Sequence, residues 1–185
     1  MSAAVPCNAR SATKRSWTGS TRVVLALFLA SCVQVVHAGG CSVSSSGLAF
    51  GAYQTLSFAG KIASAEVAST ATISIRCTGI SLGGSYTLSL GPTTAGGASI
   101  NPRRMANGAN SGGDAMLFNA YTDAARTNVW GDGSTGSQFA GTIAVNRSSV
   151  QNFTHTAYGK ILGGQTTLKA GTYSAAPTIT LTYNP

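Results

Sequence analysis

The side chains that could do chemistry are few in this sequence. The chain holds 12 Lys and Arg, four Asp and Glu and two His, and only 9% of its 185 residues are charged. His155 lies in an alternating segment, and a lone histidine cannot build a zinc site without further nitrogen or thiolate ligands. A Ser-His-Asp triad would need a nucleophile, and the sequence has no Gly-x-Ser-x-Gly elbow. We therefore expect His155 on a solvated strand face, and no catalytic residue, cofactor or metal ligand.

A second chemical motif is the glycine pattern G-x-G-x-x-G at residues 131–136. In dinucleotide sites such glycines open a helix directly after a parallel strand, whereas residues 137–141 carry no helical pattern. A glycine-rich hairpin loop after a short strand is the better interpretation. The acidic residues are too far apart along the chain for a calcium-binding loop, although folding could still bring a pair together.

The basic residues gather ahead of an apolar run near the N-terminus. Four of them lie within residues 10–22, and residues 23–30 are all apolar. With a small-residue site after this run, the pattern predicts a secretory signal peptide over residues 1–38, cleaved between Ala38 and Gly39. A transmembrane anchor is disfavoured because the apolar run is shorter than the ~20 residues that a span requires.

Export would decide the state of the cysteines. Two of the four, Cys32 among them, belong to the predicted leader, so the mature chain 39–185 keeps Cys41 and Cys77. An oxidising compartment favours a disulfide between them, because neither a CxxC spacing nor a histidine cluster indicates a metal site. Cys32 also ends the small-residue pattern of a bacterial lipoprotein signal, so acylation there stays open as an alternative to ordinary cleavage.

Charge and composition exclude several classes of protein. The formal net charge of +8 comes partly from the leader, and the remaining basic residues are scattered, so nucleic acid is not an expected partner. The low charged fraction also disfavours a helical protein, whose surface is normally rich in Glu, Lys and Arg. Disorder would require either more charge or fewer apolar residues.

Beyond residue 40, the apolar residues recur with a period of two. Alternation is clearest in residues 72–77, 85–90 and 178–183, and places Cys77 on an inward face. Further candidate strands cover residues 47–50, 116–121, 128–130, 141–145 and 153–161. Gly-Gly and Asn-Gly turns separate them, which predicts a single all-β domain, an antiparallel sandwich or barrel. Residues 95–113 are rich in Gly and Asn and are expected to form a long surface loop.

Eight short motifs occur in an order that resembles a known family, the spore coat U domain family of secreted bacterial proteins. They cover residues 41–53, 73–77, 86–91, 104–105, 117–123, 129–133, 158–161 and 171–173. The family includes pilin subunits of archaic chaperone-usher systems. The resemblance implies an immunoglobulin-like antiparallel β-sandwich that lacks its last strand, with a hydrophobic groove in its place.

The resemblance also implies partners and a route. A periplasmic chaperone would fill the groove with its own strand, and an outer-membrane usher would exchange that strand for one from another pilin subunit, by β-augmentation. Ile179, Leu181 and Tyr183 would line one wall, because they alternate in the strand that ends the chain. The protein would pass through the inner membrane and periplasm to the cell surface, with no stable membrane insertion.

One departure bears on the position in a fibre. A polymerising pilin needs a donor strand ahead of its first cysteine, whereas the predicted cleavage leaves only Gly39 and Gly40 before Cys41. We therefore expect a subunit that accepts a strand but does not donate one, at a pilus tip or chain terminus.

Two other functions remain open at this point. A carbohydrate- or surface-binding adhesin module would expose Trp130, Tyr121, Arg103 and Arg104 as contacts. A secreted hydrolase would need Ser and Asp partners brought by folding around His155.

Overall fold

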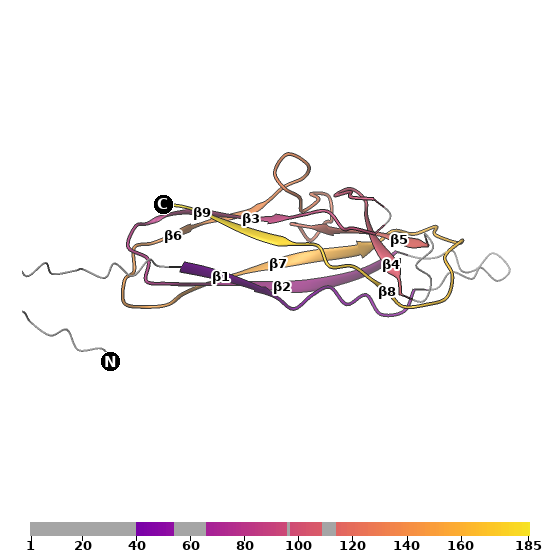
Figure 1. The fold of residues 1–185 in the computed structure, drawn as a ribbon, viewed down its shortest axis with the longest axis horizontal. Helices are drawn as coiled ribbons and strands as arrows, with labels where there is room; N and C mark the ends of the chain where they lie inside the picture. The colour runs from indigo at the N-terminus through magenta and orange to yellow at the C-terminus, as the bar shows by residue number, and fades with distance from the viewer. Residues whose placement is uncertain (1–39, 54–65, 96, 109–113) are drawn as a thin grey trace, which may run out of the picture. The chain divides into compact units, whose positions relative to one another are not determined.

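The computed structural model describes residues 40–53, 66–95, 97–108 and 114–185 (Figure 1). The predicted leader, with Cys32 and the cleavage site at Ala38 and Gly39, lies outside the described residues. Across the part of the chain that is described, no helix has the length and hydropathy needed to cross a membrane.

The described residues fold into two antiparallel sheets. The strands are β1 (Gly40–Ser45), β2 (Val67–Thr78), β3 (Gly84–Leu90), β4 (Arg103–Asn107), β5 (Ala115–Tyr121), β6 (Phe139–Ile143), β7 (Gln151–Ile161), β8 (Tyr173–Ser174) and β9 (Ile179–Asn184). One sheet has the order β1-β2-β7-β5-β4-β8 and the other the order β6-β3-β9. All of these strand pairs are antiparallel, which confirms the predicted all-β, sandwich-like fold, consistent with the immunoglobulin-like class.

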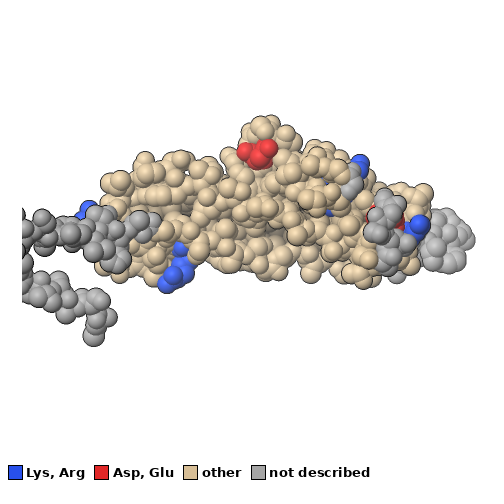
Figure 2. All heavy atoms as spheres, in the orientation of Figure 1, with Lys and Arg blue, Asp and Glu red and all other residues tan. Residues whose placement is uncertain are grey.

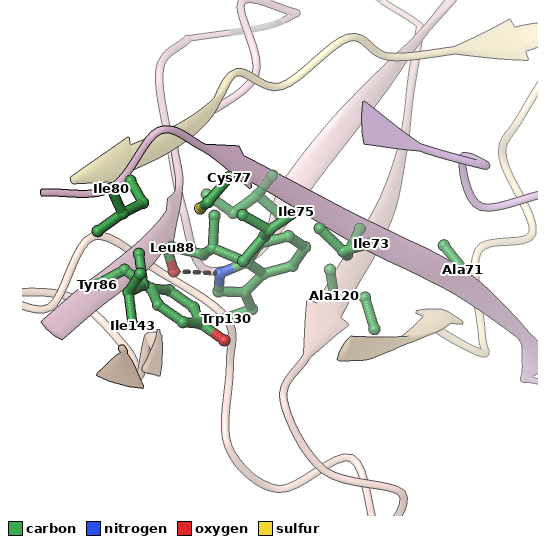
Figure 3. Packing of buried hydrophobic residues seen from close by; sticks show 12 residues of the cluster. Ala71, Ile73, Ile75, Cys77, Ile80, Tyr86, Leu88, Ala120, Trp130 and Ile143 are labelled. Carbon is green, nitrogen blue, oxygen red and sulfur yellow. Dashed lines mark hydrogen bonds between the residues drawn. The ribbon is translucent and has the colours of Figure 1, made fainter. Parts of the chain in front are cut away.

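Alternation along the strands builds the core between the sheets. In β2 the buried residues Ile73, Ile75 and Cys77 alternate with exposed neighbours, so one face of the strand packs inward. Trp130 lies among them in Figure 3, and its indole Nε1 donates a hydrogen bond of 2.9 Å to the carbonyl of Leu88. The core therefore forms from the period-two pattern that the sequence shows.

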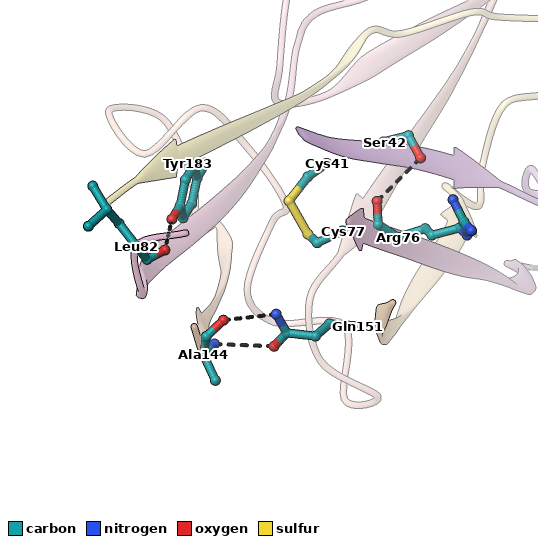
Figure 4. Close-up of a disulfide and its surroundings, with 8 residues drawn as sticks. All are labelled: Cys41, Ser42, Arg76, Cys77, Leu82, Ala144, Gln151 and Tyr183. Carbon is teal, nitrogen blue, oxygen red and sulfur yellow. Dashed lines mark hydrogen bonds between the residues drawn. A yellow bond between two sulfur atoms is a disulfide. The ribbon is translucent and has the colours of Figure 1, made fainter. Parts of the chain in front are cut away.

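A disulfide joins the first two strands. Cys41 and Cys77 are directly paired across the β1–β2 ladder and are bonded to each other, as predicted (Figure 4). The bond links an edge strand to a central one, because β2 also pairs with β7 along its length. Cys77 is fully buried, so the bridge lies against the core.

Three local predictions are wrong. Residues 95–113 are not a continuous surface loop, because Arg103–Asn107 forms β4; its inward positions include an arginine and an asparagine, so no apolar alternation reveals it. Residues 128–130 make only isolated bridges, with Tyr121 and Ser137. Residues 47–50 form no strand, because β1 ends at Ser45 and Gly47 has a φ of 75°, which departs from strand geometry.

Candidate strand-accepting cleft

An apolar cavity of about 960 Å³ lies between the two sheets. Its lining combines inner faces of strands with two further segments, residues 45–53, which start at the last residue of β1, and residues 169–177, which include the two-residue β8. The other strand residues that line it are Ala71, Ile73, Leu90, Met105, Met116, Phe118, Ala120, Ala157, Ile161 and Ile179, joined by Trp130. A volume of this size is in the range of ligand-binding pockets, so the described residues leave the interior of the sandwich incompletely filled here.

Strand β9 borders this cavity and lies at the end of its sheet. Its inner edge pairs with β3, and no strand among the described residues pairs with its outer edge. Ile179, Leu181 and Tyr183 are half-buried, alternate with exposed residues and pack against the core, and Ile179 lines the cavity. An unpaired strand edge presents backbone donors and acceptors to any extended segment that approaches it.

Residues 45–53 form one wall of the cavity. Leu48 and Phe50 are half-buried and alternate with exposed residues, so their side chains point inward. They lie over Gly159 of β7, where an added Cβ would come within 2.7 Å of the Phe50 ring and 2.8 Å of the Leu48 side chain. The Phe50 ring also meets Phe118 edge to face, with centroids 6.1 Å apart.

Leu48 and Phe50 were not singled out by the sequence analysis as cleft residues. The signal was present, because alternation in residues 47–50 suggested a strand with these two side chains on one face. What the pattern did not reveal is that both side chains cover Gly159, a buried glycine of β7.

Residues 169–177 form the other wall, which a carboxylate anchors. Asp114 accepts hydrogen bonds from the backbone N–H of Lys169 at 3.0 Å, from Asn107 Nδ2 at 3.3 Å and from the hydroxyl of Tyr173. The Tyr173 hydrogen bond is the main reason that the pKa of Asp114 is lowered. Burial and the same carboxylate raise the pKa of Tyr173, which keeps its hydroxyl protonated as a donor.

Arg103 is not an exposed contact, contrary to the sequence analysis. It is completely buried on β4, and its guanidinium donates to the carbonyls of Leu90 and Trp130 and to the side chain of Asn119. Burial lowers its pKa to about 10, against the opposing charge of Asp132, so the group is charged at neutral pH. Its fork of donors ties β4 to the end of β3, which is a structural role.

The other predicted surface contacts are also corrected by their burial. Trp130 exposes 2% of its surface because it packs in the core between the sheets. Tyr121 exposes 7%, although it belongs to neither core cluster, and its ring lies 5.9 Å from Lys160 Nζ. Arg104 is half-buried. The large apolar residues that the described surface does expose are Leu82, Val145 and Val150. On the face in Figure 2, charged residues are few and well separated.

The prediction of a solvated His155 is wrong. It shares the inward face of β7 with Phe153 and Ala157, and is half-buried. Its ring stacks on Phe139 at 4.7 Å, and its Nε2 is 2.9 Å from the hydroxyl of Tyr86. Burial lowers the pKa of His155, so the neutral ring is favoured.

These contacts bear on the chemistry that the sequence left open. The neighbours described for His155 are aromatic rings and one phenol, which leaves the hydrolase alternative without its serine and carboxylate. Within the described ranges no three His, Cys, Asp or Glu residues gather as metal ligands. Residues 131–136 form a loop, as predicted, in which Asp132 accepts hydrogen bonds from the N–H groups of Ser134 and Thr135.

A sandwich with an unpaired strand edge beside an apolar cavity belongs to the class of folds that can take part in β-augmentation. The family model of the Spore Coat Protein U domain matches residues 26–182, a span that includes β1 to β8 and most of β9. The chain therefore belongs to the spore coat protein U domain family, a family of pilus- and coat-type subunits. No curated protein matched the sequence.

Proposed function

We propose that the mature chain is a non-catalytic structural subunit of an extracellular pilus or surface coat, assembled by donor-strand complementation. The observation that carries the proposal is the unpaired outer edge of β9 beside the apolar cavity that Ile179 lines. Family membership supports the pilus or coat setting. The disulfide and the predicted leader both favour an exported product.

The geometry supports one mode of recognition. An incoming strand would pair with the outer edge of β9 through backbone hydrogen bonds, and its alternate side chains would enter the cavity. The six residues of β9 span about 20 Å, so a donor that pairs along the whole strand needs at least a similar length. Half-buried Leu181 and Tyr183 would continue the wall that Ile179 begins.

The partners follow from this mode. A periplasmic chaperone would hold the subunit by lending a strand, and an outer-membrane usher would exchange that strand for one from another subunit. The route is export through the inner membrane, transit through the periplasm and display at the cell surface.

We place the subunit at a tip or chain terminus. With cleavage after Ala38, the residues before Cys41 would be Gly39 and Gly40. Gly40 already belongs to β1 and pairs with Thr78, so it is committed to the subunit's own sheet. Such a chain can accept a strand and has no free segment to donate. Labelled copies found along the interior of a polymer would contradict this position.

The test is co-expression of the exported chain with a candidate periplasmic chaperone, followed by mass spectrometry and peptide exchange. The probe is a 12-residue synthetic peptide with Val at alternate positions and Thr between them. A one-to-one complex that exchanges its chaperone for the peptide supports the proposal. A stable monomer that needs no chaperone and ignores the peptide contradicts it.

A matched pair of variants locates the binding edge. Ile179→Asn places an amide in the cavity, whereas Thr180→Asn changes the neighbouring exposed residue of the same strand. We expect weaker peptide binding only for Ile179→Asn, with near-ultraviolet circular dichroism confirming that both variants fold. Equal loss in the two variants would indicate that the peptide does not use the cavity.

A further inference from the structure

The cleft has two walls outside the long strands, residues 45–53 and residues 169–177, and they are held in different ways. Residues 169–177 are anchored by the Asp114 carboxylate, and Gly108 donates a backbone hydrogen bond of 2.9 Å to the carbonyl of Thr172. Residues 47–51, called the strap here, have no backbone-to-backbone hydrogen bond in the described part of the chain. The other wall is anchored on both sides of the strap, because the N–H of Ser46 donates to the carbonyl of Thr72 at 3.0 Å and the hydroxyl of Tyr53 donates to the carbonyl of Leu162 at 3.1 Å. Polar anchoring is therefore strong along residues 169–177, and sparse along the strap between its two flanking anchors.

Serine hydroxyls supply the hydrogen bonds of the strap backbone. Ser69 Oγ donates to the carbonyl of Ala49 at 2.8 Å, and the N–H of Gly47 donates to Ser45 Oγ at 3.1 Å. Ser46 Oγ contacts the carbonyl of Gly47 at a longer 3.4 Å. Segments with few backbone hydrogen bonds and exposed backbone open locally at low cost.

Glycines mark both ends of the strap. Gly47 has φ of 75° and Gly51 has φ of 71°, in the left-handed region that other residues rarely adopt. An added Cβ at either position would meet no described atom within 4 Å, so neither end is packed against the described part of the fold. Two unpacked glycines on either side of a three-residue segment are suited to act as hinges.

Apolar contact holds the middle of the strap. Leu48 and Phe50 cover Gly159, which has no positive φ and so needs no glycine for its backbone. The nearest atoms to an added Cβ at Gly159 are those of the Leu48 and Phe50 side chains. The absence of a side chain at Gly159 therefore leaves room for Leu48 and Phe50 to pack against β7.

We infer that the strap is the movable wall of the cleft: it swings on Gly47 and Gly51, lifts Leu48 and Phe50 from Gly159, and so admits a strand to the cavity. The strap lines the cavity together with Ile179, so its withdrawal widens the space beside β9. Residues 169–177 stay in place, held by Asp114. The identity of the entering strand rests on the proposed function, whereas the motion of the strap does not.

Gly159→Ala tests the motion without altering the strap. The new methyl group would crowd Leu48 and Phe50 and favour the open position. Gly40→Ala is the matched control, because a Cβ there meets no atom within 4 Å. Cleavage by chymotrypsin after Phe50, in the strap, and after Tyr173, in the other wall, is measured on the oxidised mature chain. We expect the rate of cleavage after Phe50 to rise about tenfold in Gly159→Ala, in line with the cost of overpacking by one methyl, and the rate of cleavage after Tyr173 to stay unchanged.

Two results would overturn the inference. Cleavage that becomes faster equally in both walls would mean general loosening of the fold, and cleavage after Phe50 that stays unchanged would mean a fixed wall. Phe50→Ala provides a second variant in case Gly159→Ala folds poorly, since it removes the ring in place of crowding it. Trp130 lines the cavity, so its quenching by acrylamide should increase in both variants.

Binding of the alternating Val/Thr peptide separates this inference from the proposed function. If the strap gates entry, Gly159→Ala should bind the peptide severalfold faster than the unaltered chain, and Gly40→Ala should not. Slower or weaker binding would mean that the donor strand needs the strap as a wall of its site. That result would overturn the inference that the strap gates entry. If no variant binds any peptide while cleavage after Phe50 still becomes faster in Gly159→Ala, the proposed function fails and the moving strap stands.

Discussion

Replacing Arg103 by methionine is the sharpest test of how the sheets are held together. The guanidinium is buried and donates five hydrogen bonds. The acceptors are the carbonyls of Gly91 at 3.0 Å, Ile100 at 3.1 Å, Leu90 at 2.6 Å and Trp130 at 2.7 Å, and Asn119 Oδ1 at 2.8 Å. Methionine matches the length of the side chain and supplies no donor. The substitution therefore leaves these acceptors without the partner that now joins β4 to the end of β3.

The expected cost follows from the number of bonds. A hydrogen bond contributes about 0.5–1.5 kcal/mol net, so five would contribute about 2.5–7.5 kcal/mol. Burying the charge offsets part of this, as the lowering of the pKa of Arg103 to about 10 indicates, and methionine regains some apolar packing. We expect Arg103→Met to lower the free energy of unfolding by about 3 kcal/mol, or the Tm by about 6–12 °C.

The assay is urea unfolding of the oxidised mature chain, with Arg76→Met as control because Arg76 is exposed on β2. The control should change the free energy of unfolding by less than about 0.5 kcal/mol. Arg103→Lys should fall between the two, since an ammonium has three donors against the five of a guanidinium. An Arg103→Met variant within about 1 kcal/mol of the unaltered chain would refute the reasoning.

Three further predictions concern the disulfide and two titrating groups. Replacing Cys41 and Cys77 by serine should lower the free energy of unfolding by about 4 kcal/mol in the chain-entropy model, measured by urea unfolding. The pKa of Asp114 is lowered, chiefly by Tyr173, so its contribution is present above the unfolded carboxyl pKa of about 3.9 and is lost as pH falls through the folded value. Asp114→Asn should flatten that acid dependence in unfolding curves between pH 7 and pH 3. Burial lowers the pKa of His155, so the fold should lose stability as pH drops below about 6.5 and level off below the folded pKa. His155→Phe should remove this slope, and an NMR titration of the ring that gives a raised pKa would contradict it.

Strong alternation made much of the sheet predictable. Residues 72–77, 85–90 and 178–183 lie within β2, β3 and β9, apart from the first residue of the last segment. Each carries large apolar side chains on one face, so burial and period agree. The disulfide was predictable for a different reason, because export leaves the mature chain with a single pair of cysteines.

The misses at β4 and at His155 have a common physical cause, which is a polar group on an inward position. Arg103 and Asn107 occupy buried sites of β4. The guanidinium of Arg103 is held by Leu90, Asn119 and Trp130, which lie 13 to 27 residues away and which no local pattern reveals. His155 was assigned by its polar neighbours, although strand parity places it on the face of Phe153 and Ala157. The alternation of side chains along β7 was therefore a better guide to the burial of His155 than its polar neighbours were. Nothing local in the sequence could have predicted that Arg103 is buried.

If the chain accepts a donor strand as proposed, the position of the cavity explains why a subunit with an empty cleft would need a partner. The buried apolar residues form two clusters, one around Trp130 and one made of Met105, Met116, Phe118 and Ile161, and the cavity touches members of both. Side chains that entered from a donor strand would contact the two clusters at once and join them into one core. Because a ligand that binds only the folded state stabilises it, occupancy and stability would then be linked. An unoccupied subunit would be the least stable form, which is the form that a chaperone strand would protect.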